Sequence, residues 1–407
     1  MNKKIIISFL ALLIVMLACV NPLGTPAQPQ NVETIVASTL SALTSPATNP
    51  NETANPNTTN ILPHSMYYLA NDGAGLNQIY RLDKDGKTVT QLTFEPVNVQ
   101  EYDVSPIDGS IAFVANNQLL TVNADGSNRA MIFDGGAMDE NNPFLTRINS
   151  PVWSPDGQTI AFGHKGLNFY SIIAGQANLI IPDSVEDQGN GFMFPQELIW
   201  PEKYSPDGTK LILTLGYYEG ASTAIYYLNG GAVVRLNMPD TERAIICCGD
   251  YSLNNDASAL YAASPSFGMF NAGLWRVDTV NGNVTTLFKG DFDTNPANLA
   301  DAVFVGPDGL LYYFYASIPT TGDIVTRAPL QLVRSEIDGV TNRTVLRPET
   351  FEKMNEALWA PDASFVIVAN AEIPDIYYGG AAQLYYVDGQ KAMIPLVPFA
   401  QEMKWGP

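Results

Sequence analysis

A turn phrase that recurs at even spacing is the feature that most constrains the fold of this chain. Each copy has an apolar or aromatic residue, then Ser, Ala or Gly before Pro, then Asp and usually Gly, and a strand-forming run follows. The clearest copies occupy residues 153–157 and 204–208, and looser or degraded ones lie at 104–109, 251–256, 305–309 and 359–363. Pro presets φ, Asp bonds to its own backbone and Gly supplies a positive φ, so each phrase predicts a β-hairpin.

The spacing of the phrases predicts a repeat. Their Asp residues stand at positions 108, 156, 207, 256, 308 and 362, which leaves gaps of 48, 51, 49, 52 and 54 residues. One copy would indicate only a hairpin, whereas six at nearly constant spacing indicate a repeat architecture. A second hairpin pattern recurs as well, at 78–93, 119–133, 274–288, 330–346 and 384–397. Two hairpins in series make four antiparallel strands, which is one propeller blade, so we expect an all-β propeller.

The repeat resembles that of a known family. The Trp-Ser-Pro-Asp-Gly phrase at 153–157, followed by an Ile-Ala-Phe strand, and the Ile-Tyr-Arg-Leu-Asp strand at 79–83 are similar to the TolB-like β-propeller repeat. TolB, tricorn-type proteases and the propellers of prolyl oligopeptidases share this repeat. The resemblance covers residues 64–407 and implies the fold. It implies little about function, because the matching residues belong to turns and core, and no separate N-terminal domain like that of TolB is evident.

The two ends of the repeat region set the expected number of blades. Residues 66–70 match the second strand of a unit with no first strand before them, and residues 403–407 match a first strand that then stops. Pairing of these two strands would close the ring and leave no exposed edge strand. Residues 64–407 then divide into seven blades of about 49 residues, close to the observed gaps, whereas six blades, the alternative, would need about 57 residues each.

Residues 1–18 have the pattern of a signal peptide. A basic start precedes an apolar run over residues 5–18 that is too short to span a bilayer comfortably. The run ends at Cys19 in a sequence that resembles the lipobox of bacterial lipoproteins, and this resemblance implies that Cys19 is acylated and becomes the mature N-terminus. The alternative is an ordinary cleaved signal with an incidental Cys. Residues 19–63 are rich in Asn, Thr and Pro, which predicts a tether without stable structure.

The charge of the chain limits the kinds of partner that are expected, and its cysteine content limits the possible disulfides. The formal net charge is −20, and such an acidic surface repels phosphate backbones, so no nucleic acid is expected to bind. We expect contact with a membrane only through the N-terminal lipid, and a monomeric domain. Besides Cys19 the chain has only the adjacent Cys247 and Cys248. These two either form a strained vicinal disulfide or are two small buried residues of a strand.

Motifs for catalysis are absent from the sequence. It contains no G-x-S-x-G nucleophile elbow, and its only histidines are His64 and His164, too few for a His-rich metal site. The Asp-Lys-Asp-Gly sequence at 83–86 lacks the later acidic ligand of a calcium loop, which favours an ordinary hairpin turn. We therefore expect no catalytic residue, no metal and no cofactor.

Binding is expected on the face that carries the long loops. In a four-strand meander the Ser-Pro-Asp-Gly turns and the second-hairpin turns share one face. The loops between the second and third strands share the other face with the blade connections. These loops are long in several units, and the connections include an irregular stretch at 181–197. Long loops on a rigid scaffold are the usual place for binding residues. Their aromatic and acidic residues are the ligand-binding candidates: Tyr217, Tyr218, Phe267, Phe270, Asp323, Asp375, Tyr377 and Tyr378.

The leading hypothesis is a non-catalytic lipoprotein of the cell envelope whose propeller binds a protein or peptide on the long-loop face. The Tyr pairs at 217–218 and 377–378 are expected three blades apart, and therefore on nearly opposite sides of the ring. One alternative is a glycan-binding propeller, since sugars stack on aromatic rings and hydrogen-bond to acids. The other is a propeller hydrolase or lyase with an acidic or metal site on the axis.

Overall fold

The computed structural model describes residues 60–407 apart from 190, 219, 238–250, 266–271, 291–293 and 321–326. Residues Thr59–Pro407 form one compact unit. The predictions for the signal peptide, Cys19, the tether and the Cys247-Cys248 pair lie outside the described residues. Leu62 is buried, and the amides of Ile61 and Leu62 both donate to the carbonyl of Lys84 at 3.0 Å. Contacts of the folded unit therefore begin a few residues before position 64.

Nearly all regular structure in the described residues is β-strand, beside the short helix α3 (Pro143–Thr146). Hydrogen bonding sorts the strands into six sheets. Four of the sheets have four strands each. The first contains β4 (Glu101–Val104), β5 (Ile111–Ala115), β6 (Gln118–Val122) and β7 (Ala130–Asp134), and the second contains β8 (Asn149–Trp153), β9 (Thr159–Gly163), β10 (Gly166–Ser171) and β11 (Gln176–Pro182). The third contains β17 (Tyr251–Leu253), β18 (Ala259–Ser264), β19 (Ala272–Asp278) and β20 (Val284–Gly290), and the fourth contains β21 (Ala297–Val305), β22 (Leu311–Ile318), β23 (Gln331–Ser335) and β24 (Thr344–Thr350).

The other two sheets are larger. The five-stranded sheet contains β12 (Ser184–Asp187), β13 (Met193–Tyr204), β14 (Lys210–Tyr217), β15 (Gly220–Tyr227) and β16 (Val233–Arg235). The seven-stranded sheet contains β25 (Met354–Trp359), β26 (Phe365–Asn370), β27 (Gly380–Tyr386) and β28 (Ile394–Trp405), followed by β1 (Met66–Asn71), β2 (Asn77–Leu82) and β3 (Val89–Gln91). All pairings between these named strands are antiparallel. Each joins two strands that are neighbours in sequence, except the pairing of β28 with β1.

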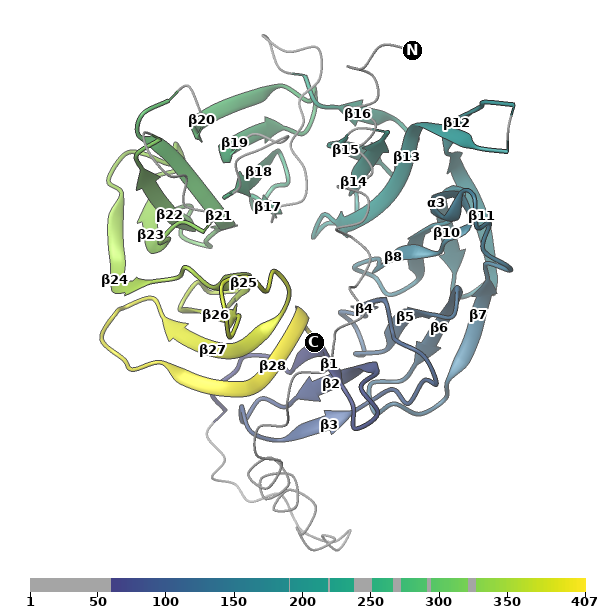
Figure 1. Cartoon of the computed structure of the whole chain (residues 1–407), viewed down its shortest axis with the longest axis horizontal. Coiled ribbons are helices and arrows are strands. Elements are labelled where there is room, and N and C mark those ends of the chain that lie inside the picture. The colour runs from purple at the N-terminus through teal and green to yellow at the C-terminus, as the bar shows by residue number, and fades with distance from the viewer. Residues whose placement is uncertain are drawn as a thin grey trace, which may run out of the picture. The chain divides into compact units, whose positions relative to one another are not determined.

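The sheets stand around a central axis, and in the four-stranded sheets the first strand is innermost. Figure 1 shows β4, β8, β17, β21 and β25 nearest the centre, and β3, β7, β11 and β24 at the periphery. Each four-stranded sheet then runs outward in sequence order, as in β4-β5-β6-β7. This is the arrangement of propeller blades, so the predicted all-β propeller of four-stranded antiparallel units is confirmed.

The ring is closed by the last strand, as the sequence predicts. The first part of β28 pairs with β27, whereas its last residues pair with β1 through Met66↔Trp405 and Tyr67↔Lys404. The long strand β13 is shared in the same way between β12 and β14. When these two strands are divided between their partners, the pairings give seven four-stranded groups and one separate hairpin, formed by β12 and the start of β13. We therefore propose seven blades.

The recurring phrases form the predicted hairpin turns. In the clearest copy the Ser154 amide donates to the Thr159 carbonyl at 2.8 Å, and the Gly157 amide donates to the Ser154 carbonyl at 2.9 Å. The Asp156 carboxylate accepts the Ser154 hydroxyl at 2.6 Å and the Gln158 amide at 3.0 Å. Gly157 has a φ of 67°, the left-handed conformation that favours glycine. The sequence at 83–86 is likewise a turn, closed by the Gly86 amide on the Asp83 carbonyl at 2.9 Å.

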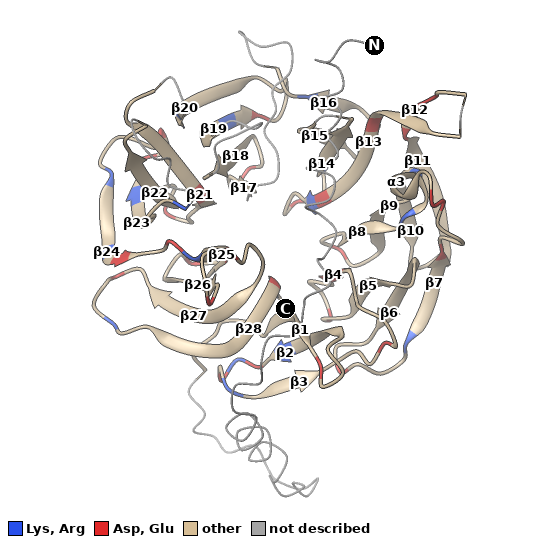
Figure 2. Cartoon of the chain, in the orientation of Figure 1, with Lys and Arg blue, Asp and Glu red and all other residues tan. Residues whose placement is uncertain are grey.

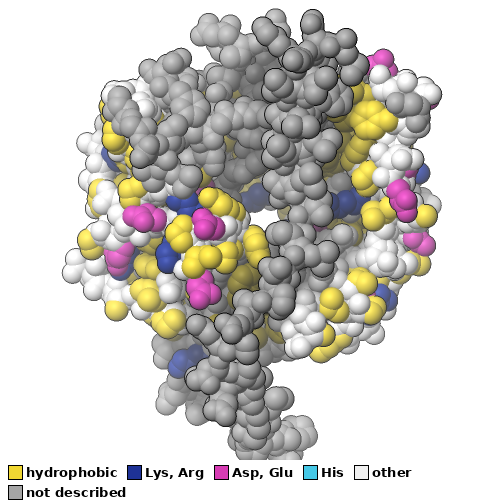
Figure 3. Space-filling view, viewed as in Figure 1, with side chains coloured by type: hydrophobic (Ala, Val, Ile, Leu, Met, Phe, Trp, Pro, Cys, Tyr) yellow, Lys and Arg dark blue, Asp and Glu magenta, His cyan; other side chains and the backbone are white. Residues whose placement is uncertain are grey.

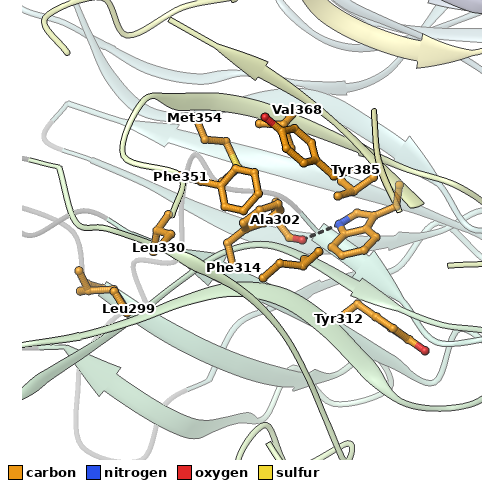
Figure 4. Packing of buried hydrophobic residues seen from close by; sticks show 14 of the residues in the cluster. Leu299, Ala302, Tyr312, Phe314, Leu330, Phe351, Met354, Val368 and Tyr385 are labelled. Atoms are coloured by element: carbon orange, nitrogen blue, oxygen red, sulfur yellow. Dashed lines mark hydrogen bonds between the residues drawn. The ribbon is translucent and has the colours of Figure 1, made fainter. Parts of the chain in front are cut away.

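The core lies between neighbouring sheets. One cluster joins Phe314 and Leu299 of the β21–β24 sheet to Trp359, Val368 and Tyr385 of the next sheet. Figure 4 shows these side chains interleaved, with a dashed hydrogen bond that ends on the carbonyl oxygen of Ala302. The donor is the indole nitrogen of Trp359, at 2.7 Å. Packing of this kind holds each blade to the next.

One predicted irregular connection is a regular element. Residues 181–197 were expected to be a loop, but β12 and the start of β13 pair there as a hairpin, with Glu186 opposite Phe194 and Asp187 opposite Met193. Only Val185 of Ser184–Asp187 is half-buried and its neighbours are exposed, as in a strand that mostly faces solvent. The Gly residues at 189 and 191 have positive φ values of 74° and 84°, as turn residues often do.

Candidate functional site

Among the predicted candidates that the structure describes, those in the loop between β26 and β27 present the largest set of exposed apolar side chains. Tyr377 is 64% exposed and Tyr378 is 61% exposed, and Ile373 and Asp375 are also exposed. We call these four residues the β26–β27 platform. Figure 3 shows hydrophobic side chains gathered with acidic and basic ones over the β25–β27 region, beside the opening at the axis.

The platform loop is held from beneath by Arg327. Its guanidinium donates to the side chain of Asn355 at 2.7 Å and to the carbonyl of Ile376 at 2.6 Å. The same group lies 4.3 Å from the ring centroid of Tyr377, which is a cation–π contact. Arg327 therefore fixes both the loop backbone and one face of an exposed ring. No local sequence pattern indicates this contact, because Arg327 belongs to the preceding β22–β23 connection.

Asn355 and two glycines complete the support of the platform loop. The Asn355 amide donates to the carbonyls of Gly379 at 2.7 Å and Ile376 at 3.2 Å. Gly380 has a φ of 146°, and a Cβ there would lie 2.2 Å from the carbonyl oxygen of Asn370. Only glycine fits this close approach of the two strands. The loop is thus ordered by its backbone contacts, while its aromatic side chains face solvent.

The second predicted Tyr pair is more deeply packed. Tyr218 is exposed, but its ring stacks on Phe194 with centroids 4.6 Å apart and an interplanar angle of 25°. Tyr217 is half-buried and packs against the cluster that includes Leu213 and Leu215. This pair therefore offers one exposed ring, already in contact with the β12–β13 hairpin.

The structure does not bring the predicted candidates together. The strands that carry the Tyr217–Tyr218 pair, β14 and β15, lie across the axis from β26 and β27 (Figure 1), as expected from their separation in the repeat. Asp375 lies in the same loop as Tyr377 and Tyr378. Phe267, Phe270 and Asp323 lie outside the described residues.

Charged residues gather on the innermost strands, a feature that the sequence reasoning did not select. Figure 2 shows acidic and basic residues on the axis-facing parts of β13 and β28. Lys404 lies 3.1 Å from the Asp103 carboxylate, and Arg147 lies 2.7 Å from the Glu101 carboxylate. A signal was available in the repeat, because Glu101, Glu356 and Glu402 each stand three residues before the residue that opens a turn phrase.

Most of these carboxylates bind backbone groups of the adjacent blade. Glu101 accepts the amide of Ser150, and Glu356 accepts the amide of Glu402 at 2.7 Å and that of Met403. Asp103 accepts the amide of Trp153 at 2.7 Å. These contacts link successive innermost strands. The acids near the axis therefore have a structural role that does not require a catalytic reaction.

Glu402 differs from the other acids near the axis. Burial raises its pKa to about 7, although Lys404 opposes the shift. Burial also raises the pKa of Glu202 on β13. Glu402 can therefore take up or release a proton near neutral pH, at the strand that closes the ring.

The described residues show no cluster of three or more His, Cys, Asp or Glu side chains that could hold a metal ion. His164 lies edge-on to Phe133 with ring centroids 5.3 Å apart, and burial lowers its pKa. His64 lies next to the closing strand, 6.4 Å from Trp405 between centroids. Within the same part of the chain, no helix has the length and apolarity needed to cross a bilayer.

No protein-family model and no curated protein matches the chain. Among solved structures, TolB from Acinetobacter baumannii is 14% identical, with 81% of this chain and 79% of that chain covered and a TM-score of 0.42. A structure from a study of two prolyl endopeptidases is 11% identical over 85% of this chain and 51% of that chain, with a TM-score of 0.50. A functionally unknown protein from Desulfotomaculum acetoxidans is 12% identical, covers 84% and 99%, and has a TM-score of 0.51. These likenesses concern the fold alone.

Proposed function

We propose that this chain is a non-catalytic lipoprotein of the cell envelope whose propeller binds a protein or peptide through the β26–β27 platform. The observation that carries the proposal is a pair of largely exposed Tyr side chains on a loop that Arg327 and Asn355 hold in place. Two adjacent, largely exposed aromatic rings on an ordered loop form an apolar patch of the kind found at interaction sites. Tyr is a frequent anchor of protein interfaces, since it gives a large contact area at low entropy cost.

The support of the loop bears on affinity. A mobile loop would lose conformational entropy when it binds, whereas a loop held by several hydrogen bonds has already lost most of it. The cation–π contact also keeps the Tyr377 ring in one orientation. The platform is therefore prepared for a partner, and truncation of a Tyr that contacts the centre of the interface should cost about 2 kcal/mol, or roughly 30-fold in affinity.

Site-specific cross-linking in intact cells tests the proposal. A photoreactive amino acid at position 378 should capture a defined partner, and the same group at position 280, on an exposed hairpin turn of another blade, should not. The captured partner is then titrated against purified Tyr377→Ala and Tyr378→Ala chains, with Tyr218→Ala as the matched exposed-Tyr control. We expect weaker binding for at least one platform variant and unchanged binding for the control. Cross-links confined to the Asp-Gly turns, or equal affinity for all variants, would place the site elsewhere.

The proposal of a lipid anchor rests on the lipobox-like sequence at Cys19 and on the Asn-, Thr- and Pro-rich segment after it. Cys19→Ala should abolish labelling with a clickable fatty acid and move the protein from the membrane pellet to the soluble fraction. Cys247→Ala is the control and should leave both properties unchanged. A Cys19→Ala chain that still incorporates the label and sediments with membranes contradicts the lipoprotein assignment.

A further inference from the structure

A groove lies between two neighbouring blades on the face opposite the platform. It encloses about 410 Å³ between the β4–β7 sheet and the β8–β11 sheet, at the ends that carry the Asp-Gly turns. Ile107, Trp153, Tyr170 and Ile172 supply apolar walls, and Asp108 and Asp156 lie at the same groove. None of the described residues that line it is Lys or Arg.

The groove is shaped by an insertion in one turn phrase. In residues 104–109 the turn is closed by the Gly109 amide on the Ser105 carbonyl at 3.0 Å, one residue wider than the Gly157-to-Ser154 bond of the next blade. The extra residue is Ile107, which is 62% exposed. Its side chain reaches the next blade, since a Cβ at Gly157 would lie 3.1 Å from it.

The exposed aliphatic residues at the groove have no role in the core. Ile172 and Ile173 follow β10 in an exposed hairpin turn, and Ile172 lines the groove. A single exposed aliphatic residue is ordinary on a protein surface, but two that line one groove beside acidic residues, Ile107 and Ile172, form an apolar patch of the kind found at interaction sites. We infer from this that an apolar group of a partner covers these aliphatic side chains.

The acids at the rim determine the charge of that partner. Hydrogen bonds from Ser154 and Gln158 lower the pKa of Asp156. Desolvation opposes the shift at Asp108, but hydrogen bonds from Ser105 and Ser110 outweigh it and lower its pKa as well. Both groups are therefore anionic at neutral pH, on a chain whose net charge is −20. A second copy of the chain would be repelled, and the tether at 19–63 contains neither Lys nor Arg.

We propose that this groove binds a basic segment of a partner protein. The segment would insert one aliphatic or aromatic side chain between Ile107, Trp153 and Ile172, and its flanking Lys or Arg residues would face Asp108 and Asp156. The apolar side chain supplies affinity by leaving water, and the opposite charges supply orientation and a faster encounter. This binding is independent of the β26–β27 platform, which lies on other blades.

A peptide titration tests the groove directly. The probe is a synthetic peptide in which Leu and Phe alternate with Lys, titrated by calorimetry into the purified chain, and a matched peptide carries Glu in place of Lys. We expect the Lys peptide to bind and the Glu peptide to fail. Ile107→Ser and Ile172→Ser should each weaken binding about tenfold or more.

Two controls separate groove binding from general attraction between opposite charges. Val280→Ser changes a residue that is 68% exposed on a hairpin turn of another blade and should leave binding unchanged. Tyr377→Ala should also leave it unchanged, so failure of the platform proposal and failure of this one are distinguishable. Equal binding by the Ile107→Ser and Val280→Ser chains, equal binding of the Glu peptide, or no binding of the Lys peptide overturns the proposal. All three aliphatic residues are exposed, so we expect each variant to fold, and thermal melting of each variant verifies this.

Discussion

At the scale of single residues, the turns are specified by backbone conformation more than by contacts. Gly309 closes one of the turn phrases with a φ of 79°, and a Cβ at that position would meet nothing within 4 Å. Gly309→Ala should therefore cost about 1 kcal/mol of unfolding free energy, entirely from the left-handed backbone. Urea unfolding followed by circular dichroism measures the change.

Gly73→Ala is the matched control for this substitution. Gly73 is also exposed and open on all sides, but it has no left-handed φ. We expect Gly73→Ala to be neutral or slightly stabilising, because Ala restricts the unfolded chain. Equal losses for the two variants would show that the conformation of Gly309 is not the cause.

Glu402 makes stability depend on pH. Its ordinary pKa is 4.5, and burial raises the pKa in the folded chain to about 7. Between these values the folded protein holds a proton that the unfolded chain lacks, so the unfolding free energy should fall as the pH rises from 4.5 to 7. The stabilisation is complete below pH 4.5 and absent above pH 7. Because the side chain is partly exposed, we expect a total of about 1 kcal/mol.

Denaturant unfolding at a series of pH values measures this contribution. Glu402→Gln should flatten the curve between pH 5 and pH 7.5 relative to the wild type. The exposed residue Glu372 supplies the control variant, Glu372→Gln, which should keep the wild-type slope. Burial also raises the pKa of Asp183, to about 6, so the difference between wild type and variant is the quantity to compare. A Glu402→Gln curve that parallels the wild type contradicts the assignment.

At the scale of elements, indole hydrogen bonds connect successive blades. Trp359 donates to the carbonyl of Ala302 at 2.7 Å, whereas the indole nitrogen of Trp153 is buried with no partner among the described residues. Both side chains are 8% exposed. Trp359→Phe and Trp153→Phe should therefore lose similar buried area, but only the first also leaves a buried carbonyl unpaired.

The comparison of these two variants isolates the hydrogen bond. We expect Trp359→Phe to lose about 1–2 kcal/mol more unfolding free energy than Trp153→Phe, which is the usual cost of an unsatisfied buried polar group. Urea unfolding of both variants under the same conditions gives the difference. Equal losses would mean that packing alone links these blades.

The sequence predicted the elements well where turn chemistry is local. Each Asp-Gly phrase formed its hairpin, because Pro, Asp and Gly determine the turn without help from distant residues. The degraded copy at 251–256 was harder to recognise as a turn. Asn254, and not Ser252, closes that turn, and the Ser252 hydroxyl accepts the amide of Val305 in the next blade at 2.9 Å. The β12–β13 hairpin was missed, since no turn phrase marks it.

The candidate site was predictable only in part. Sequence reasoning selected Tyr377 and Tyr378 by residue type and loop length, and both are exposed. It could not distinguish them from Tyr217, which packs into the β13–β15 core, because burial of a loop side chain depends on contacts from other elements. The contact of Arg327 with the platform could not be predicted for the same reason, since Arg327 belongs to the preceding blade.

At the scale of the whole molecule, the split repeat at the two chain ends determines how the ring is held together. The last residues of β28 form the innermost strand of the blade that β1 continues. Trp405 donates its indole hydrogen to the Trp359 carbonyl at 2.7 Å, Gly406 donates to the Ser65 carbonyl at 2.9 Å, and Lys404 pairs with Asp103. A few residues thus contact three successive blades.

Deletion of residues 404–407 should therefore destabilise the entire propeller and not only its last blade. The truncation removes the pairing with Met66 and Tyr67, exposes the edge of β1 and opens the cluster in which Trp405 packs against Phe365. We expect a loss of at least about 3 kcal/mol, a broader unfolding transition and a greater tendency to aggregate. Lys404→Met is the control, because it removes the ion pair with Asp103 while the strand still pairs, and it should cost much less. Urea unfolding and light scattering measure both variants. A truncated chain that unfolds at the same urea concentration as the intact one would show that the blades do not need closure through β28.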